Sequence, residues 1–344
     1  MSDKIKQLAP QIWSEIQKAN HILLCCHVRP DLDSVGSNLA MKLTLDSLGK
    51  QSTLISGDDP PLDSVKFLKS FEEIESRSFP QTELQDYDLF ISIDISAPSQ
   101  ITRQTELRFP IGIKTINIDH HKTNISFGDI NLVENKMISS SEMAYQLIYQ
   151  NNPELINSDI ATCLFVGIWG DSGGFKFEGT TSETFATASD LVKRGAESWQ
   201  SVSKLTQIGF KNILVFGKTL SLAQNYFNGG VVITKIPLSY FLEQDITGEK
   251  VSDTKNTVAF FLSQCTEAVI TAVIYEYEPR RINISLRSNN PNKFLDVTKI
   301  ATAFAVGGGH ARAAGAKIEN STVDEAEKEI LKTIQKIYPD LGQP

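Results

Sequence analysis

"HVRPDLDSVGS", residues 27–37, follows the apolar run "HILLCC" and is the stretch on which the fold of this chain depends. Pro30 favours a turn, and Asp33 or Ser34 is an ordinary N-cap for a helix. A turn between a strand and a helix explains these residues but leaves His27 unexplained. The stretch therefore predicts a strand, a short turn and a helix, with polar side chains gathered at the turn.

The first half of the chain alternates strands with helices. This order predicts an α/β fold with a mostly parallel sheet and helices on both faces. The expected strands are 21–28, 51–56, 89–94, 114–119 and 129–134, and the expected helices are 34–49, 140–151 and 158–169. The acidic motifs "ISIDIS" and "NIDHH" end two of these strands. Open α/β sheets bind ligands at the carboxyl ends of their strands, so this placement indicates a site.

The second half predicts a smaller α+β domain joined to the first by helices. Residues 182–230 suggest a helical stretch broken near Gly195. Expected strands at 231–237, 268–277 and 281–288 and helices near 254–264 and 295–305 follow, and the glycine run "VGGGHARAAGA" leads into a last strand and helix. We therefore expect a first domain at 1–195, a helical connector at 196–228 and a second domain at 229–344.

Composition narrows the class of protein. The 344 residues are 41% hydrophobic and 22% charged, as in an ordinary globular protein. The longest apolar runs are far shorter than the roughly 20 residues that span a bilayer, and the N-terminus lacks a secretory segment. We expect a cytoplasmic protein without a membrane partner.

The charge distribution favours a small anionic ligand over a long one. The net charge of −8 argues against binding of long nucleic acid, which usually needs a basic face. Residues 279–317 are an exception, because they hold seven basic residues and one acidic residue, a local charge of +6. This segment could hold a small anionic ligand.

Eight side chains suited to metal chemistry gather near the expected strand ends. They are His27, Asp31, Asp33, Asp94, Asp119, His120, His121 and Asp171. One strand-end aspartate is usually a turn former, so it is their accumulation that indicates a site. We expect Asp31 and Asp33 to point to the same side of an extended segment, with His27 one short turn away.

The ligand set is too large for one metal ion. Four carboxylates and two or three imidazoles suit two ions about 3.5–4 Å apart that share a carboxylate. Oxygen and imidazole ligands without thiolate favour Mn²⁺, with Mg²⁺, Co²⁺ and Fe²⁺ as alternatives. Such a pair provides what phosphodiester cleavage requires, activation of water near neutral pH and neutralisation of phosphoryl oxygens.

Five ordered motifs resemble those of the DHH phosphoesterase family with its DHH-associated C-terminal domain. They are "HVRPDLDSVGS", "ISIDIS", "IDHH", "GIWGDSGGF" and "GGGHARAAGA", and they cover nearly the whole chain. The resemblance implies one metal ion on His27, Asp31 and Asp94 and a second on Asp33, Asp94, His120 and Asp171, with Asp94 bridging. It also implies that His121 faces the substrate phosphate or leaving group and that Asp119 orients a motif histidine. The implied substrate-binding residues are Arg287, Gly308, Gly309, His310 and Arg312.

The resemblance implies a function as well. By length and layout the chain is similar to oligoribonucleases that act on very short RNA and also dephosphorylate 3′-phosphoadenosine 5′-phosphate (pAp). The implied partner is a short RNA or nucleoside bisphosphate substrate. The alternatives are a phosphodiesterase of cyclic di-AMP and its linear product pApA, a RecJ-like single-strand exonuclease and a nucleotide-binding protein without catalysis. Inorganic pyrophosphatases have a similar first domain, but "GGGHARAAGA" resembles the nucleotide-binding companion domain instead. A homodimer is compatible with the sequence.

Overall fold

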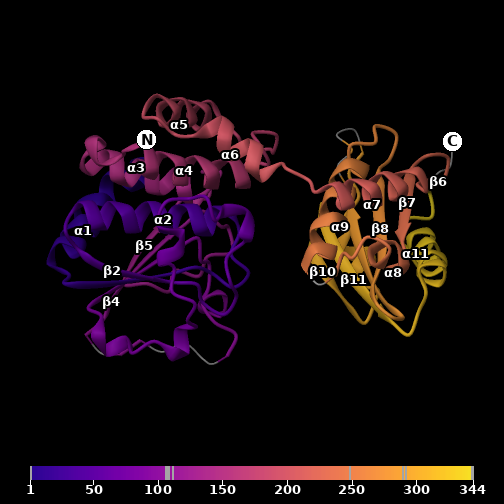
Figure 1. Cartoon of the computed structure of the whole chain (residues 1–344), viewed down its shortest axis with the longest axis horizontal. Coiled ribbons are helices and arrows are strands. Elements are labelled where there is room, and N and C mark those ends of the chain that lie inside the picture. Colours follow the sequence, from indigo (N-terminus) through magenta and orange to yellow (C-terminus); the bar gives the residue numbers. More distant parts are fainter. Residues whose placement is uncertain are drawn as a thin grey trace. The chain divides into compact units, whose positions relative to one another are not determined.

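The chain folds as two compact units, Met1–Gln207 and Ile208–Pro344 (Figure 1). The computed structural model describes residues 2–104, 109–110, 112–247, 249–288, 290 and 293–341. The division lies inside the segment expected to be a connector: α6 (Ser198–Leu205) belongs to the first unit and α7 (Phe210–Ser221) to the second. The expected limits of 195 and 229 stay a prediction.

A five-stranded parallel sheet forms the centre of the first unit and confirms the predicted α/β fold. Its strands are β1 (His21–Cys25), β2 (Gln51–Ile55), β3 (Leu89–Ile93), β4 (Lys114–Asp119) and β5 (Ile130–Val133). Their order is β2-β1-β3-β4-β5, with every neighbouring pair parallel. The chain leaves β1 toward one edge and returns to β3 on its other side. The carboxyl ends of β1 and β3 therefore flank a topological switch point, where such sheets bind ligands.

The prediction of helices on both faces of this sheet is wrong in detail, because the described α-helices pack on one face and loops with short 3₁₀ helices cover the other. Side chains alternate along β1, so that Ile22 and Leu24 join one core and Leu23 and Cys25 the other. The first core is closed by the α-helices α1 (Asp3–Lys18), α2 (Leu32–Ser47), α3 (Ser140–Asn151) and α4 (Ser158–Asp171), with α5 (Ser182–Lys193) and α6 outside them. Loops and short 3₁₀ helices line the second core, including η3 (Phe79–Gln81) and η4 (Leu84–Asp86).

Close packing of α2 on α4 fixes the position of the polar side chains. A Cβ atom added at Gly36 would lie 2.5 Å from the Cys163 carbonyl oxygen, and one added at Gly167 would lie 2.8 Å from an oxygen of Asp33. Only glycine allows such a close approach of the two helices. The carboxylates at the start of α2 and at the end of α4 are thereby brought to one end of the sheet.

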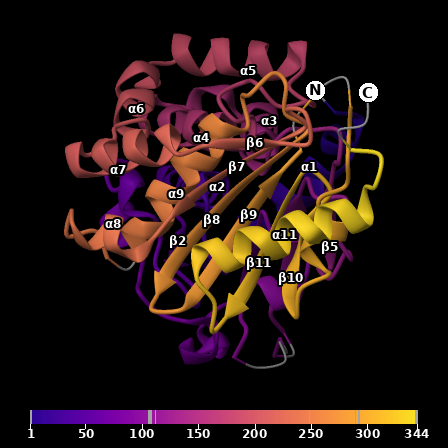
Figure 2. The ribbon, with the colours of Figure 1, turned by 90° about the vertical axis from the view of Figure 1, so that its right-hand side faces the viewer.

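The second unit is built on a six-stranded mixed sheet with the order β10-β11-β9-β8-β7-β6. Its strands are β6 (Gln224–Tyr226), β7 (Val231–Ile236), β8 (Ile270–Glu278), β9 (Arg281–Arg287), β10 (Val306–His310) and β11 (Ala313–Glu319). Helices α10 (Thr298–Ala301) and α11 (Val323–Ile337) cover one face, on which Figure 2 shows α11 crossing the strands. Helices α7, α8 (Leu238–Leu242) and α9 (Glu249–Leu262) pack on the other face.

Three predicted elements of the second half are wrong in detail. The helix expected over 295–305 is reduced to α10, because the chain turns back there and the Ala301 carbonyl faces Gly307. The helical stretch expected to close at Gly230 ends with α7 and is followed by strand β6. The glycine run is itself strand β10, because it pairs with β11 in an antiparallel hairpin. Within the described ranges, no helix is long and apolar enough to cross a membrane.

Candidate metal centre

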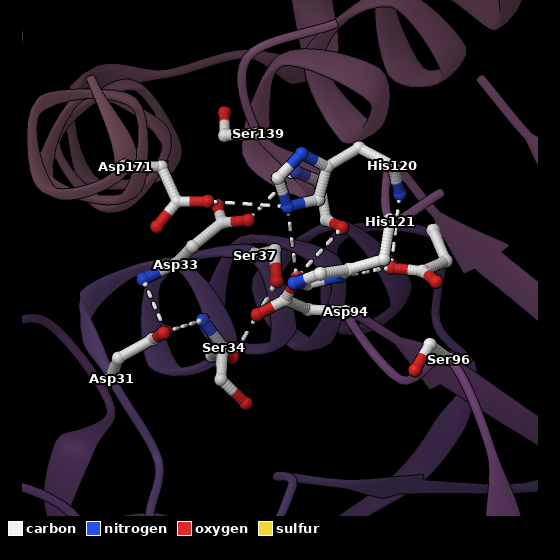
Figure 3. A network of polar contacts seen from close by, with 12 residues as sticks. Asp31, Asp33, Ser34, Ser37, Asp94, Ser96, His120, His121, Ser139 and Asp171 are labelled. Atoms are coloured by element: carbon white, nitrogen blue, oxygen red, sulfur yellow. Dashed lines mark hydrogen bonds and ion pairs between the residues drawn. The ribbon is translucent and has the colours of Figure 1, made fainter. Parts of the chain in front are cut away.

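Strand ends bring most of the candidate ligands together (Figure 3). His27 lies two residues after β1 and Asp94 directly after β3, so both flank the switch point. Asp119 is the last residue of β4, and His120 and His121 follow it. The predicted gathering of these side chains is therefore a result of parallel strand order.

Two features of the predicted site are wrong. Asp31 and Asp33 do not lie on an extended segment, because Asp31 is the N-cap of α2 and Asp33 lies in its first turn. The Asp31 carboxylate accepts hydrogen bonds from the backbone N–H groups of Asp33 and Ser34, at 3.0 and 2.9 Å. Asp171 is the last residue of helix α4 and does not lie at a strand end. It reaches the cluster through the packing of α4 on α2.

The side chains form two groups that meet at Asp94. In one group, His27 Nε2 lies 3.3 Å from Asp94 Oδ2 and 3.6 Å from Asp31 Oδ1. In the other, His120 Nε2 lies 3.5 Å from Asp94 Oδ1 and 3.2 Å from Asp171 Oδ2. The two oxygens of Asp94 thus face different imidazoles, which is the geometry that a bridging carboxylate needs.

Helix α3 holds two of these carboxylates in place. Asp33 accepts hydrogen bonds from the backbone N–H groups of Ser140 and Ser141, at 2.7 and 2.9 Å. The Ser140 hydroxyl also donates to Asp94 Oδ1 at 3.1 Å. Sequence reasoning missed Ser140, although "SSSE" at 139–142 has the pattern of a helix N-terminus and could have indicated backbone donors there.

Comparison with known proteins agrees with this geometry. Residues 21–168 match the DHH family N-terminal domain, and residues 228–339 match the DHHA1 domain. The chain belongs to the DHH family. It is 27% identical to the bifunctional oligoribonuclease and PAP phosphatase NrnA of Thermus thermophilus, over 95% of each chain. It is also 26% identical to the cyclic-di-AMP phosphodiesterase GdpP of Geobacillus thermodenitrificans, over 96% of this chain and 49% of that protein.

A solved structure shows the same fold. An exopolyphosphatase-related protein from Bacteroides fragilis superposes with a TM-score of 0.85 at 22% identity, over 98% of each chain. We refer below to Met1–Gln207 as the DHH unit and to Ile208–Pro344 as the DHHA1 unit. Family membership and the buried cluster together make the chain a metal-dependent phosphoesterase.

The donor set of the DHH unit fits divalent metal ions. Ligand atoms lie within 4.8 Å of one another in the group of His27, Asp31 and Asp94 and again in the group of Asp33, His120 and Asp171. His120 Nε2 is buried and lies close to the carboxylates of Asp171 and Asp94, but it forms no well-aligned hydrogen bond with a described residue. A buried polar atom without a hydrogen bond costs free energy, and metal coordination would remove that cost.

The charges around His27 and His120 also indicate a site for cations. Burial lowers the pKa of His120, but contacts with the carboxylates of Asp171 and Asp94 outweigh burial and raise this pKa to about 11. Burial likewise lowers the pKa of His27, yet contacts with Asp31 and Asp94 raise it to about 11. The carboxylates therefore stabilise positive charge beside both imidazoles. A divalent cation bound next to each imidazole would supply this charge.

His121 lies at the edge of the cluster and is held by Asp119. Its Nδ1 atom is 2.8 Å from Asp119 Oδ1, and its side chain is 40% exposed. The buried Asp119 carboxylate also accepts a hydrogen bond from the Asn124 amide at 2.6 Å. Sequence reasoning missed Asn124, because no motif marks it. The arrangement fixes the ring of His121 while leaving it accessible.

The DHHA1 unit holds the remaining candidates, all of them close to β10. Arg287 ends β9, and the register places Arg287, Ala313 and His310 in one row across β9, β11 and β10. Gly308 and Gly309 belong to β10. Arg312 lies in the β10–β11 turn, with its guanidinium 5.0 Å from the centre of the Phe294 ring. The structure thus gathers the predicted substrate-binding residues at one edge of this sheet.

Proposed function

We propose that the chain is a Mn²⁺-dependent phosphohydrolase that degrades very short oligoribonucleotides and dephosphorylates pAp. The observation that carries this proposal is the similarity to NrnA of Thermus thermophilus over 95% of both chains. The predicted cytoplasmic location belongs to the same proposal.

The proposed metal site uses the two groups that meet at Asp94. His27, Asp31 and Asp94 would hold one ion, and Asp33, Asp94, His120 and Asp171 would hold the other. Oxygen and imidazole ligands favour Mn²⁺ over softer ions. A bound pair of ions would supply an activated water molecule and neutralise the charge of the phosphoryl oxygens.

The protein's own groups would orient the substrate. Asp119 fixes Nδ1 of His121, so the other side of this half-exposed ring can face a substrate phosphate or leaving group. Arg287, His310 and Arg312 would hold a nucleotide on the DHHA1 unit, and Gly308 and Gly309 would let its phosphate or sugar approach the backbone. Binding and chemistry would then depend on different units.

A second candidate function is hydrolysis of cyclic di-AMP or pApA. It is favoured by the similarity to GdpP, but this chain spans only 49% of that protein. It would use the same metal centre and differ in the substrate held by the DHHA1 unit.

A substrate panel tests the proposal. With Mn²⁺, we expect hydrolysis of pAp and of RNA of two to about five nucleotides, and a falling kcat/KM for longer RNA, because a chain of net charge −8 offers few phosphate contacts. Product analysis should include pApA, cyclic di-AMP and pyrophosphate. Preference for cyclic di-AMP would favour the second candidate. Affinity that rises with RNA length would indicate a RecJ-like exonuclease, and nucleotide binding without turnover would indicate a non-catalytic protein.

Replacement of His310 by alanine should separate binding from chemistry. We expect KM for pAp to rise about tenfold or more, because a charge-assisted hydrogen bond is lost from an exposed strand. Hydrolysis of bis(p-nitrophenyl) phosphate should be unchanged, since this small diester needs only the metal centre. The variant Arg280→Ala, which removes an exposed cation at the β8–β9 turn, is the matched control. Equal losses on both substrates would place His310 in the catalytic centre.

A further inference from the structure

Two half-buried cations of the DHHA1 unit have no acidic partner among the described side chains. Lys255 lies on α9 and Arg287 at the end of β9. Among the residues that the structure describes, no carboxylate forms an ion pair with either of them. Within the described part of the chain, the Arg287 guanidinium donates hydrogen bonds to neutral oxygens, those of Ser285 and Leu286, at 3.2 and 2.9 Å.

Lys255 and Arg287 lie on the same face of the sheet. The Lys255 ammonium is 5.6 Å from the centre of the Tyr275 ring, and Tyr275 pairs with Asn283 of β9. Asn283 and Arg287 are four residues apart on one strand, so their side chains project from the same face. His310 shares this face, because it lies in one row with Ala313 and Arg287.

The sheet next to Lys255 and Arg287 carries small residues. Gly308 and Gly315 pair with each other, and Gly315 pairs with Ser285. A Cβ atom added at Gly308 would meet no other atom within 4 Å. The fold itself therefore does not require glycine at 308, and its absent side chain leaves open space on the face that carries Arg287.

Placing these charges together costs free energy in the unliganded protein. Burial, assisted by the positive charge of Arg287, lowers the pKa of Lys255 to about 8. Half-buried charges are normally paired, because removal from water is otherwise uncompensated. The acids described farther along this face do not compensate them, since Arg281 holds Glu278 at 2.7 Å and Glu319 at 3.1 Å. An anionic ligand would provide the missing charge.

We propose that Lys255 is a further substrate-recognition residue, which binds a phosphate monoester group of the nucleotide together with Arg287. The inference rests on the proposed function, because it specifies which part of a short phosphorylated nucleotide is recognised. A guanidinium can donate two parallel hydrogen bonds to phosphate oxygens, and a lysine ammonium adds a compact charge. Terminally phosphorylated nucleotides should therefore bind better than nucleosides.

Binding of 5′-AMP and adenosine to the full chain in the presence of EDTA tests this role. Isothermal titration should show that Lys255→Met weakens 5′-AMP binding at least about tenfold and leaves adenosine binding unchanged. Methionine keeps an unbranched apolar stem beside Tyr275. Lys255→Arg should retain most of the affinity. Lys332→Met, on α11 over the opposite face, is the matched control and should bind like the wild type.

Thermal unfolding separates recognition from a structural role. Removal of an uncompensated charge should leave the melting temperature of Lys255→Met unchanged or raise it. A lower melting temperature, unchanged 5′-AMP binding, or equal losses for 5′-AMP and adenosine would each overturn the inference.

If phosphate-dependent binding requires Lys255 but the wild type hydrolyses neither pAp nor short RNA, the proposed function fails and the recognition role stands. If Lys255→Met hydrolyses pAp with an unchanged KM, the recognition role fails alone.

Discussion

Removal of divalent metal should abolish phosphoesterase activity and lower the melting temperature of the DHH unit by about 5–10 °C for each ion removed. Four carboxylates, those of Asp31, Asp33, Asp94 and Asp171, lie around two imidazoles in this unit. A ligand at 100 times its Kd stabilises the folded state by about 2.7 kcal/mol, and for a domain of this size each kcal/mol corresponds to about 2–4 °C. Calorimetry of the EDTA-treated chain with and without added Mn²⁺ measures the shift.

The metal ion that restores activity after EDTA treatment distinguishes the proposed metal centre from a calcium site. Mn²⁺ should restore activity best, because the site combines imidazole with carboxylate ligands. Ca²⁺ prefers six to eight oxygen ligands and should restore little. The variant Asp63→Asn, which removes an exposed carboxylate paired with Lys66, should show the full shift with Mn²⁺. Equal activity with Ca²⁺, or full activity in EDTA, would contradict the metal centre.

The DHH unit could be predicted from sequence where local pattern decides structure. Buried parallel strands appear as short apolar runs, and each of β1, β3 and β4 is followed within two residues by an acidic or imidazole side chain. The side chains at these strand ends lie at one edge of the sheet whatever the order of the strands, because parallel strands run in the same direction. The amino-acid sequence alone was therefore enough to place His27, Asp94 and His120 together.

The remaining errors have tertiary causes. Aspartates at positions 31 and 33 are compatible with an extended segment and also with the first turn of a helix. In the structure, the hydrogen bonds that Asp31 accepts from the backbone of Asp33 and Ser34 show that a helix begins here. Asp171 reaches the cluster through helix packing that requires Gly36 and Gly167, which no local pattern reveals. Glycine has low strand propensity, so β10 exists because β11 pairs with it. Ser140 acts through its backbone N–H and hydroxyl, which side-chain motifs do not describe.

Replacement of Asp94 by asparagine should be the most damaging change of a single ligand. We expect kcat/KM to fall more than about 100-fold. Removal of a residue that only hydrogen-bonds a metal ligand already lowers metal affinity or activity about 10–100-fold, and Asp94 would be a ligand itself. Asp94 has a φ of +67°, and asparagine is among the residues that tolerate this left-handed conformation. The Ser140 hydroxyl can still donate to the amide oxygen. The variant should therefore fold, and its defect should be one of charge at the metal centre.

Comparison with Asp31→Asn makes the bridging role of Asp94 testable. Among the described residues, the Asp31 carboxylate lies within 4 Å of one imidazole, that of His27, whereas the Asp94 carboxylate lies within 4 Å of both His27 and His120. Asparagine is as good an N-cap as aspartate, so α2 should be intact in the Asp31 variant. Metal analysis after dialysis against Mn²⁺ should show that Asp94→Asn weakens both ions and that Asp31→Asn weakens one. If the two variants lose the same amount of metal and activity, Asp94 belongs to a single ion, and the site then needs another group to join its two halves.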